Sequence, residues 1–131
     1  MLFHSFASQE ERRAFGGGDF VELQYCKLNH GTAIKEIVSL YTIENWEDDS
    51  LYLCSDDMNV FSEVYGEFLF GGTYANQECG YLDYYGINYF SPAQAETIRQ
   101  RLQVEQPMDY EILLNWLEQG TQYNGFYVLG V

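Results

Sequence analysis

The sequence predicts a single α+β domain in which an antiparallel sheet is packed by two or three helices. Its 131 residues suffice for one hydrophobic core and leave little for a second. Apolar residues make up 47% and aromatic residues 18%, whereas disordered chains usually combine high net charge with few aromatic residues. Stretches with strand-like alternation and stretches with helical spacing both occur. We therefore expect residues 1–131 to form one domain.

The first strands are predicted after a weakly patterned entry. Residues 1–19 end in three glycines, 16–18, which we expect to form a turn. A phosphate-binding loop would need a preceding strand and usually a lysine before a helix, and neither is present. Apolar and polar residues then alternate in part over 20–26, and a short apolar run follows at 51–54. Both segments are predicted as strands of one antiparallel sheet.

Residues 33–43 allow two interpretations. Their content of β-branched residues favours a further strand of the same sheet. Ile34, Ile37, Val38 and Tyr41 also recur at helical spacing, so the sequence leaves a short helix open as the alternative.

A helix is predicted to begin at Ser55–Asp57, where the two acidic residues would face the positive end of the helix dipole. Apolar residues at spacings of three and four then form one helical face: Met58, Phe61, Val64, Tyr65 and Phe68. We expect Gly71–Gly72 to end this helix. Residues 74–90, rich in tyrosine and glycine, are predicted to form a loop followed by a strand.

The last third of the chain predicts two helices and a strand. Ser91, Pro92 and Gln94 form a capping box with a proline at the first helical position, which predicts a helix over 92–104. Pro107 stops this helix. Asp109 is expected to cap a second helix over 110–119.

Two glycines close the C-terminal part of this prediction. Gly120 is expected to end the second helix with a positive φ. The Asn124–Gly125 turn signal precedes a short buried strand over 126–129.

Targeting and redox signals are weak throughout the chain. No stretch resembles a signal peptide or reaches the roughly 20 apolar residues of a spanning helix, so we expect a cytoplasmic protein. Cys26, Cys54 and Cys79 lie too far apart for a CxxC or zinc-knuckle pattern. In a reducing cytoplasm they are expected to be free and mostly buried thiols.

Charge is the most informative property of the sequence. Six Lys and Arg stand against twenty Asp and Glu, which gives a net charge of −14. Such a charge repels nucleic acid and anionic membrane surfaces, so neither is expected as a direct partner. Acidity on this scale serves solubility alone in many proteins, but it also suits a basic protein partner.

The acidic residues concentrate in the middle of the chain. Residues 36–98 contain twelve Asp and Glu, no Lys or Arg, and eight of the twelve tyrosines. Carboxylates steer a basic partner and desolvated tyrosines supply contact energy, which predicts a protein-binding face. The alternative is that these acids are solvated and the tyrosines belong to the core. The residues predicted to bind the partner are Glu44, Glu47, Asp48, Asp49, Asp56, Asp57, Asp83, Tyr84 and Tyr85.

No catalytic or metal-binding motif emerges. Neither His4 nor His30 lies in a known catalytic pattern, and Cys26 with His30 is at most a weak pair. The acidic runs 47–49 and 56–57 lack the alternating oxygens and central glycine of a calcium loop. We therefore expect no enzyme, no cofactor and no metal.

Three motifs mark the C-terminal part of the chain: YGINYFSP within 84–92, LLNWL within a helix pair, and the ending NGFYVLGV. In these motifs, in size and in acidity the chain resembles the immunity proteins of bacterial polymorphic toxin and contact-dependent growth inhibition systems. The resemblance implies a cytosolic protein that binds its cognate toxin domain, often a basic nuclease, and neutralises it. No site residue of such a family is carried over.

Two other classes of function stay open. Carboxylates that imitate phosphate spacing would make the protein a nucleic-acid mimic that occupies the groove of DNA-binding proteins. A small enzyme or ligand-binding domain would instead use the aromatic residues of 81–90 to line a pocket.

Overall fold

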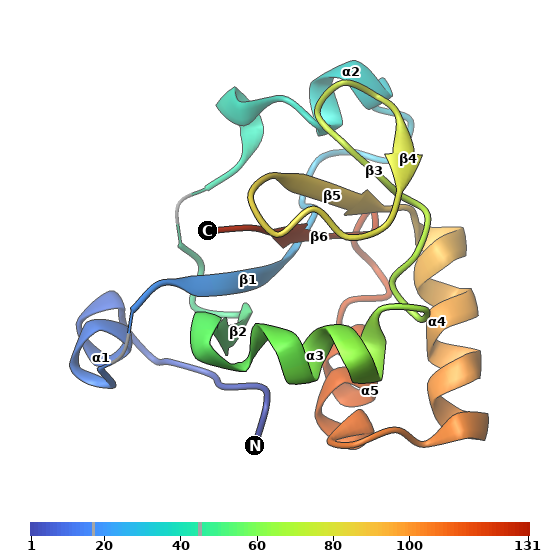
Figure 1. Ribbon diagram of the computed structural model, residues 1–131. Coiled ribbons are helices and arrows are strands. Elements are labelled where there is room, and N and C mark those ends of the chain that lie inside the picture. The colour runs from blue at the N-terminus through green and yellow to red at the C-terminus, as the bar shows by residue number, and fades with distance from the viewer. Residues whose placement is uncertain (17, 45) are drawn as a thin grey trace.

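The computed structural model describes residues 1–16, 18–44 and 46–131. Within these ranges, six strands form one antiparallel sheet in the order β2-β1-β6-β5-β3-β4 (Figure 1). The strands are β1 (Phe20–Tyr25), β2 (Leu51–Cys54), β3 (Gly72–Thr73), β4 (Cys79–Gly80), β5 (Ile87–Phe90) and β6 (Phe126–Leu129). The predicted α+β class, with one antiparallel sheet, is confirmed.

The same ranges contain five α-helices and two 3-10 turns. They are α1 (Gln9–Ala14), α2 (Ile34–Ile37), α3 (Met58–Tyr65), α4 (Pro92–Glu105) and α5 (Tyr110–Gln119), with η1 (Leu40–Thr42) and η2 (Ser55–Asp57). The three longer helices, α3 to α5, lie where the sequence predicts helices. The short α1 was not predicted, because it has no buried residue and therefore no apolar stripe to detect.

The main core lies between one face of the sheet and the three longer helices. Leu23 of β1, Phe90 of β5 and Val128 of β6 point to this face and are almost completely buried. Leu113 of α5 and Leu102 of α4 pack against them from the helical layer. Alternate residues of each strand serve this core because successive side chains of a strand point to opposite faces.

The other face of the sheet is covered by the long excursion between β1 and β2. In Figure 1 this excursion carries α2 and η1 on the side of the sheet away from α3 and α5. A second, smaller core forms beneath it from Cys26, Ile37, Val38, Ile87, Tyr89 and Tyr127. The Tyr127 hydroxyl donates to the carbonyl of Ile37 at 2.6 Å and ties α2 to β6.

Residues 33–43 are not a strand, so the helical alternative holds. Val38 N–H donates to the Ile34 carbonyl at 3.0 Å, and Thr42 N–H donates to the Ser39 carbonyl at 3.1 Å. Local bonds of this kind use the backbone groups that a sheet would need. Ile37 and Val38 face the smaller core, which explains the helical spacing of the apolar residues.

The capping box at the start of α4 is confirmed. Ser91 Oγ accepts from Gln94 N at 3.2 Å, and Gln94 Oε1 accepts from Ser91 N at 2.8 Å. Asp109 occupies the expected N-cap position of α5, but its carboxylate accepts from Leu2 N at 2.7 Å and makes no capping hydrogen bond. In this way Asp109 fixes the N-terminus instead.

Two glycine predictions also need correction. Gly120 does follow α5, but with φ −100°; a Cβ there would lie 2.1 Å from the Tyr25 ring, so close packing excludes a side chain. The helix predicted to reach Gly71 ends at Tyr65, and the turn that follows still buries Phe68. In the predicted turn at 16–18, Gly16 has φ +89°, and Gly17 lies outside the described residues.

Cys26 and Cys54 are buried and Cys79 is exposed, and all three are free thiols, so the prediction of free and mostly buried cysteines is confirmed. None of the helices in the described part of the chain is long and apolar enough to cross a membrane.

Replacement of Leu113, which is fully buried, by alanine should lower the free energy of unfolding by about 2–5 kcal/mol. Val104→Ala on α4 is the control, because Val104 is 83% exposed and should change stability by less than about 0.5 kcal/mol. Urea unfolding followed by circular dichroism measures both. Equal losses in the two variants would contradict the position of the main core.

Candidate functional site

Part of the second sheet face stays open beside the smaller core. The strand register aligns Ile87, Leu129 and Glu22 in one row across β5, β6 and β1. The neighbouring row, with Tyr89 and Tyr127, is the one that α2 covers. Over the first row lies a groove with a cavity volume of about 280 Å³, which we call the Glu22 groove. Its walls are Arg12, Phe20, Leu40, Ile43, Glu44, Tyr85, Gly86 and Gly130.

Glu22 is a buried carboxylate at the floor of this groove and is only 5% exposed. Its Oε2 accepts from Ser50 Oγ at 2.7 Å and Gln24 Nε2 at 3.1 Å. It also shares the single proton of the Tyr52 hydroxyl, at 3.3 Å, with the Glu47 carbonyl, which is closer at 2.7 Å. Burial raises the pKa of Glu22, and this effect exceeds the opposing effects of the three hydrogen bonds and of Arg12. The groove therefore has a carboxylate at its base that is costly to ionise.

Arg12 lies next to this carboxylate without forming a salt bridge to it. Its guanidinium carbon is 5.4 Å from the centre of the Tyr52 ring, and the hydroxyl of the same ring donates to Glu22. Its positive charge lowers the pKa of Glu22, and this is the smallest of the effects on that pKa. Among the described residues, the salt bridges involve neither Arg12 nor Glu22.

Large apolar side chains are exposed at the rim of the groove. Tyr85 is 78% exposed and Leu40 is 77% exposed, and Tyr41, next to Leu40 in η1, is 99% exposed. Exposed aromatic side chains gathered beside a groove are typical of a binding surface.

The turn that carries Tyr85 is fixed by hydrogen bonds. Asp83 Oδ1 accepts from Tyr85 N at 2.9 Å, and the buried Asn88 side chain donates to the Asp83 carbonyl at 2.8 Å. Gly130 N donates to the Gly86 carbonyl at 2.8 Å and so joins the turn to the C-terminal segment. Because its backbone is held, Tyr85 loses little conformational entropy when it makes a contact.

Of the residues predicted to bind a partner, Glu44 and Tyr85 meet at this groove. Asp83 is exposed but holds the Tyr85 turn, and Tyr84 packs in part against the main core. Asn45, between Glu44 and the acidic residues that follow, lies outside the described residues.

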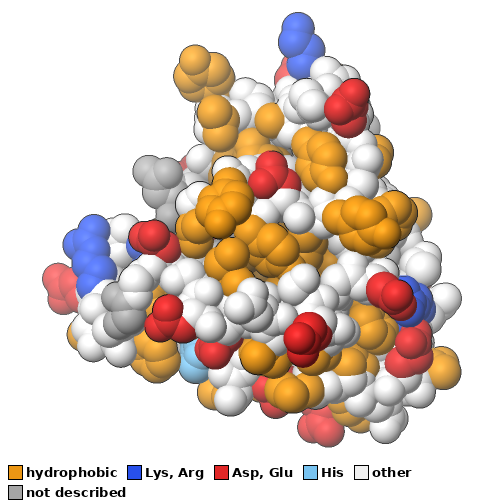
Figure 2. Space-filling view, in the orientation of Figure 1, with side chains coloured by type: hydrophobic (Ala, Val, Ile, Leu, Met, Phe, Trp, Pro, Cys, Tyr) orange, Lys and Arg blue, Asp and Glu red, His pale blue; other side chains and the backbone are white. Residues whose placement is uncertain are grey.

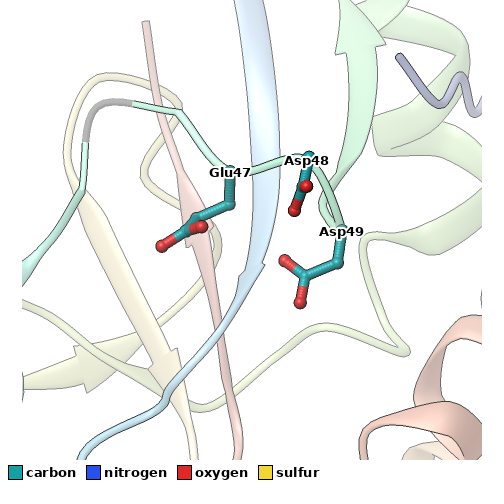
Figure 3. Close-up of side chains that lie close together, drawn as sticks. All are labelled: Glu47, Asp48 and Asp49. Atoms are coloured by element: carbon teal, nitrogen blue, oxygen red, sulfur yellow. The ribbon is translucent and has the colours of Figure 1, made fainter. Parts of the chain in front are cut away.

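Glu47, Asp48 and Asp49 form a separate acidic cluster on the loop before β2 (Figure 3). One carboxylate oxygen of each lies within 4.8 Å of the others. Lys27 Nζ lies 2.9 Å from Asp49 and 3.7 Å from Glu47. Lys27 thus neutralises part of this cluster. The sequence did not predict this ion pairing, because Lys27 lies outside residues 36–98.

Asp56 and Asp57 lie in η2, directly before α3, where the sequence placed the start of a helix. Neither lines the Glu22 groove, and Asp57 makes no capping hydrogen bond with its side chain. Of the nine predicted residues, two, Glu44 and Tyr85, line the groove, and the other seven lie elsewhere.

Glu22, Arg12 and Leu40 were missed by sequence reasoning. A signal for Glu22 exists, because it is a charged residue between Val21 and Leu23 in a strand that is otherwise buried. No sequence signal places Arg12 beside Glu22, because its position depends on how residues 1–19 fold back over β2.

Cys26, His4 and His30, the residues considered for catalysis, lie away from the Glu22 groove. Cys26 is buried in the smaller core and its thiol donates to the Tyr127 hydroxyl at 3.5 Å, whereas His30 is exposed. His4 pairs with Tyr52 through the backbone, and its ring packs at 4.7 Å from the Phe15 ring. Neither histidine lines the Glu22 groove.

Comparison with protein-family models, curated proteins and solved structures gave no match. The groove and its surroundings therefore carry the functional argument.

Glu22→Gln should stabilise the protein at pH 7, because the variant removes a buried charge and keeps an oxygen that can accept hydrogen bonds. The pKa of Glu22 is raised from 4.5, so its contribution to stability is present below about pH 4.5 and is lost as the pH rises through the folded-state pKa. The stabilisation by Glu22→Gln should therefore shrink as the pH falls from 7 toward 4.5.

Thermal unfolding of wild type and Glu22→Gln across this pH range measures the difference. Glu10→Gln in α1, an exposed position, is the charge-matched control and should show no such pH dependence. A Glu22→Gln variant less stable than wild type at pH 7 would contradict the account of the buried charge.

Proposed function

We propose that this protein binds a basic protein through the Glu22 groove and its rim, and that the partner is a toxin domain that it neutralises in the cytoplasm. One observation carries the proposal. Exposed Tyr85 and Leu40 line the groove that also contains the carboxylates of Glu44 and Glu22, and the exposed Tyr41 follows Leu40 in η1. Apolar anchors beside acidic groups suit a basic protein surface better than a small neutral ligand.

The aromatic residues of the rim would supply most of the binding energy. A few anchors near the centre of an interface usually dominate its affinity, and tyrosine is enriched among them. Tyr85 projects from a fixed turn, and Tyr41 N–H is held by Ser39 Oγ at 3.3 Å. Rigid anchors lose less entropy on binding than mobile ones.

The charge of the whole molecule would steer a basic partner toward it. The net charge is −14, and three of the six basic residues, Lys27, Arg99 and Arg101, already pair with carboxylates. In the view of Figure 2, Lys and Arg side chains lie at the periphery, whereas acidic side chains lie both there and among the apolar patches. Such a field accelerates association with a positively charged protein and weakens with added salt.

The toxin part of the proposal rests on the resemblance to immunity proteins together with this surface. A nuclease domain must be basic where it meets its nucleic acid, so an acidic groove with aromatic anchors is complementary to such a surface. Contact at that surface would block access of the substrate and protect the cell that makes both proteins.

Tyr85→Ala should weaken binding of the basic partner by at least about 10-fold, which corresponds to about 1.4 kcal/mol. Glu44→Gln should reduce the salt dependence of binding because it removes a charge at the groove. The partner is captured from the native source with the tagged protein, eluted by salt, and titrated by calorimetry against each variant.

Tyr81→Ala and Glu118→Gln are the matched controls, because both residues are exposed and lie outside the groove. If Tyr81→Ala weakens binding as much as Tyr85→Ala does, the proposed surface is wrong. Competition by DNA fragments for several unrelated basic proteins would indicate a nucleic-acid mimic instead.

Neutralisation has its own test in cells. Co-expression of the wild-type protein should restore growth to cells that produce the partner, and Tyr85→Ala should lower this protection, measured as colony counts. Full protection by a variant that has lost binding in vitro would contradict inhibition through this groove.

A further inference from the structure

The Glu22 groove offers a binding position for a positively charged side chain, and Arg12 of the protein itself lies at this groove. We propose, building on the proposed function, that Glu22 receives an arginine side chain of the partner in the position that Arg12 approaches in the free protein. Arg12 thus acts as an internal substitute for the partner's arginine, which displaces it on binding.

The surroundings of Glu22 favour a cation. Three donors, from Ser50, Gln24 and Tyr52, fix the carboxylate through its Oε2, yet none of them carries a positive charge. A buried carboxylate is costly unless it is paired with a cation. A cation that enters the groove and pairs with Glu22 would remove that cost.

The weak attachment of α1 favours displacement of Arg12. None of the residues in α1 is buried, and Arg12 approaches Glu22 without forming a salt bridge. Phe15, at the end of the helix, contacts the rings of His4, Phe6 and Phe20 but is still 51% exposed. A segment with so few buried contacts opens at low free-energy cost.

The aromatic side chains favour arginine over lysine. The guanidinium of Arg12 already lies 5.4 Å from the centre of the Tyr52 ring, and Tyr85 offers a second ring at the wall of the groove. A planar guanidinium stacks on aromatic rings while it pairs with a carboxylate, whereas a lysine ammonium is a compact and strongly hydrated charge. The groove of about 280 Å³ has room for one long side chain and its head group.

The test compares Arg12→Gln with Arg13→Gln, because both variants remove one positive charge from the same helix. Arg13 does not line the Glu22 groove, so it reports only the long-range effect of the charge change. The probe is a tri-arginine peptide at low ionic strength, with tri-citrulline as its neutral isostere, titrated into the full-length protein by NMR. The partner identified under the proposed function is then titrated in the same way by calorimetry.

Arg12→Gln should strengthen binding of tri-arginine and of the partner by about 5-fold, because the incoming arginine no longer has to displace the Arg12 guanidinium from the Tyr52 ring. Arg13→Gln should change it by less than about 2-fold. In a Glu22→Gln background the two arginine variants should become equal, and Glu22→Gln alone should weaken binding. Tri-citrulline should show no dependence on Glu22.

Equal effects of Arg12→Gln and Arg13→Gln in the wild-type background would overturn the inference, as would unchanged binding in Glu22→Gln. In either case, a partner that still depends on Tyr85 would leave the proposed function standing. A partner indifferent to Tyr85 and to Glu44 would overturn the proposed function itself.

Discussion

In the centre of the sheet, β1 pairs with β6 so that Glu22 lies opposite Leu129 and Leu23 lies opposite Val128. This register assigns the side chains of both strands to two faces, since successive residues alternate. Leu23 and Val128 enter the main core, and Glu22 lies on the other face, away from α3 to α5. A shift by one residue would place the carboxylate in the main core and move Leu23 to the face of the groove. The position of the groove follows from this pairing.

The segment between β1 and β2 contains only the short helices α2 and η1, which do not cover the whole second face of the sheet. Its α2 covers the row of Tyr89 and Tyr127, and the row of Ile87, Leu129 and Glu22 stays beside the open groove. Helices α3 to α5 thus cover one face of the sheet, whereas the other face is covered only in part. A partner that covers this face would bury the exposed rim and neutralise a carboxylate that the free protein must keep buried.

Much of the fold could be predicted because its elements carry local signals. The capping box at Ser91 and Gln94 and the helical spacing of α5 identify these elements without tertiary information. The sequence could not decide between strand and helix for residues 33–43, because the short helix there depends on packing against the sheet. The site was predictable only in part: Tyr85 and Glu44 belong to the acidic, tyrosine-rich stretch, whereas Arg12 and Lys27 reach their carboxylates through long-range folding that no spacing reveals.

The central claim is that the Glu22 groove meets the partner. Amide hydrogen exchange of the protein, free and in complex with its partner, tests it most directly because it reports which backbone segments become protected. The account predicts new protection in residues 83–86 and 39–44, at the rim of the groove, and little change in α4 and α5. Protection confined to the α4 and α5 surface, or to the loop of Glu47 and Asp49, would contradict it.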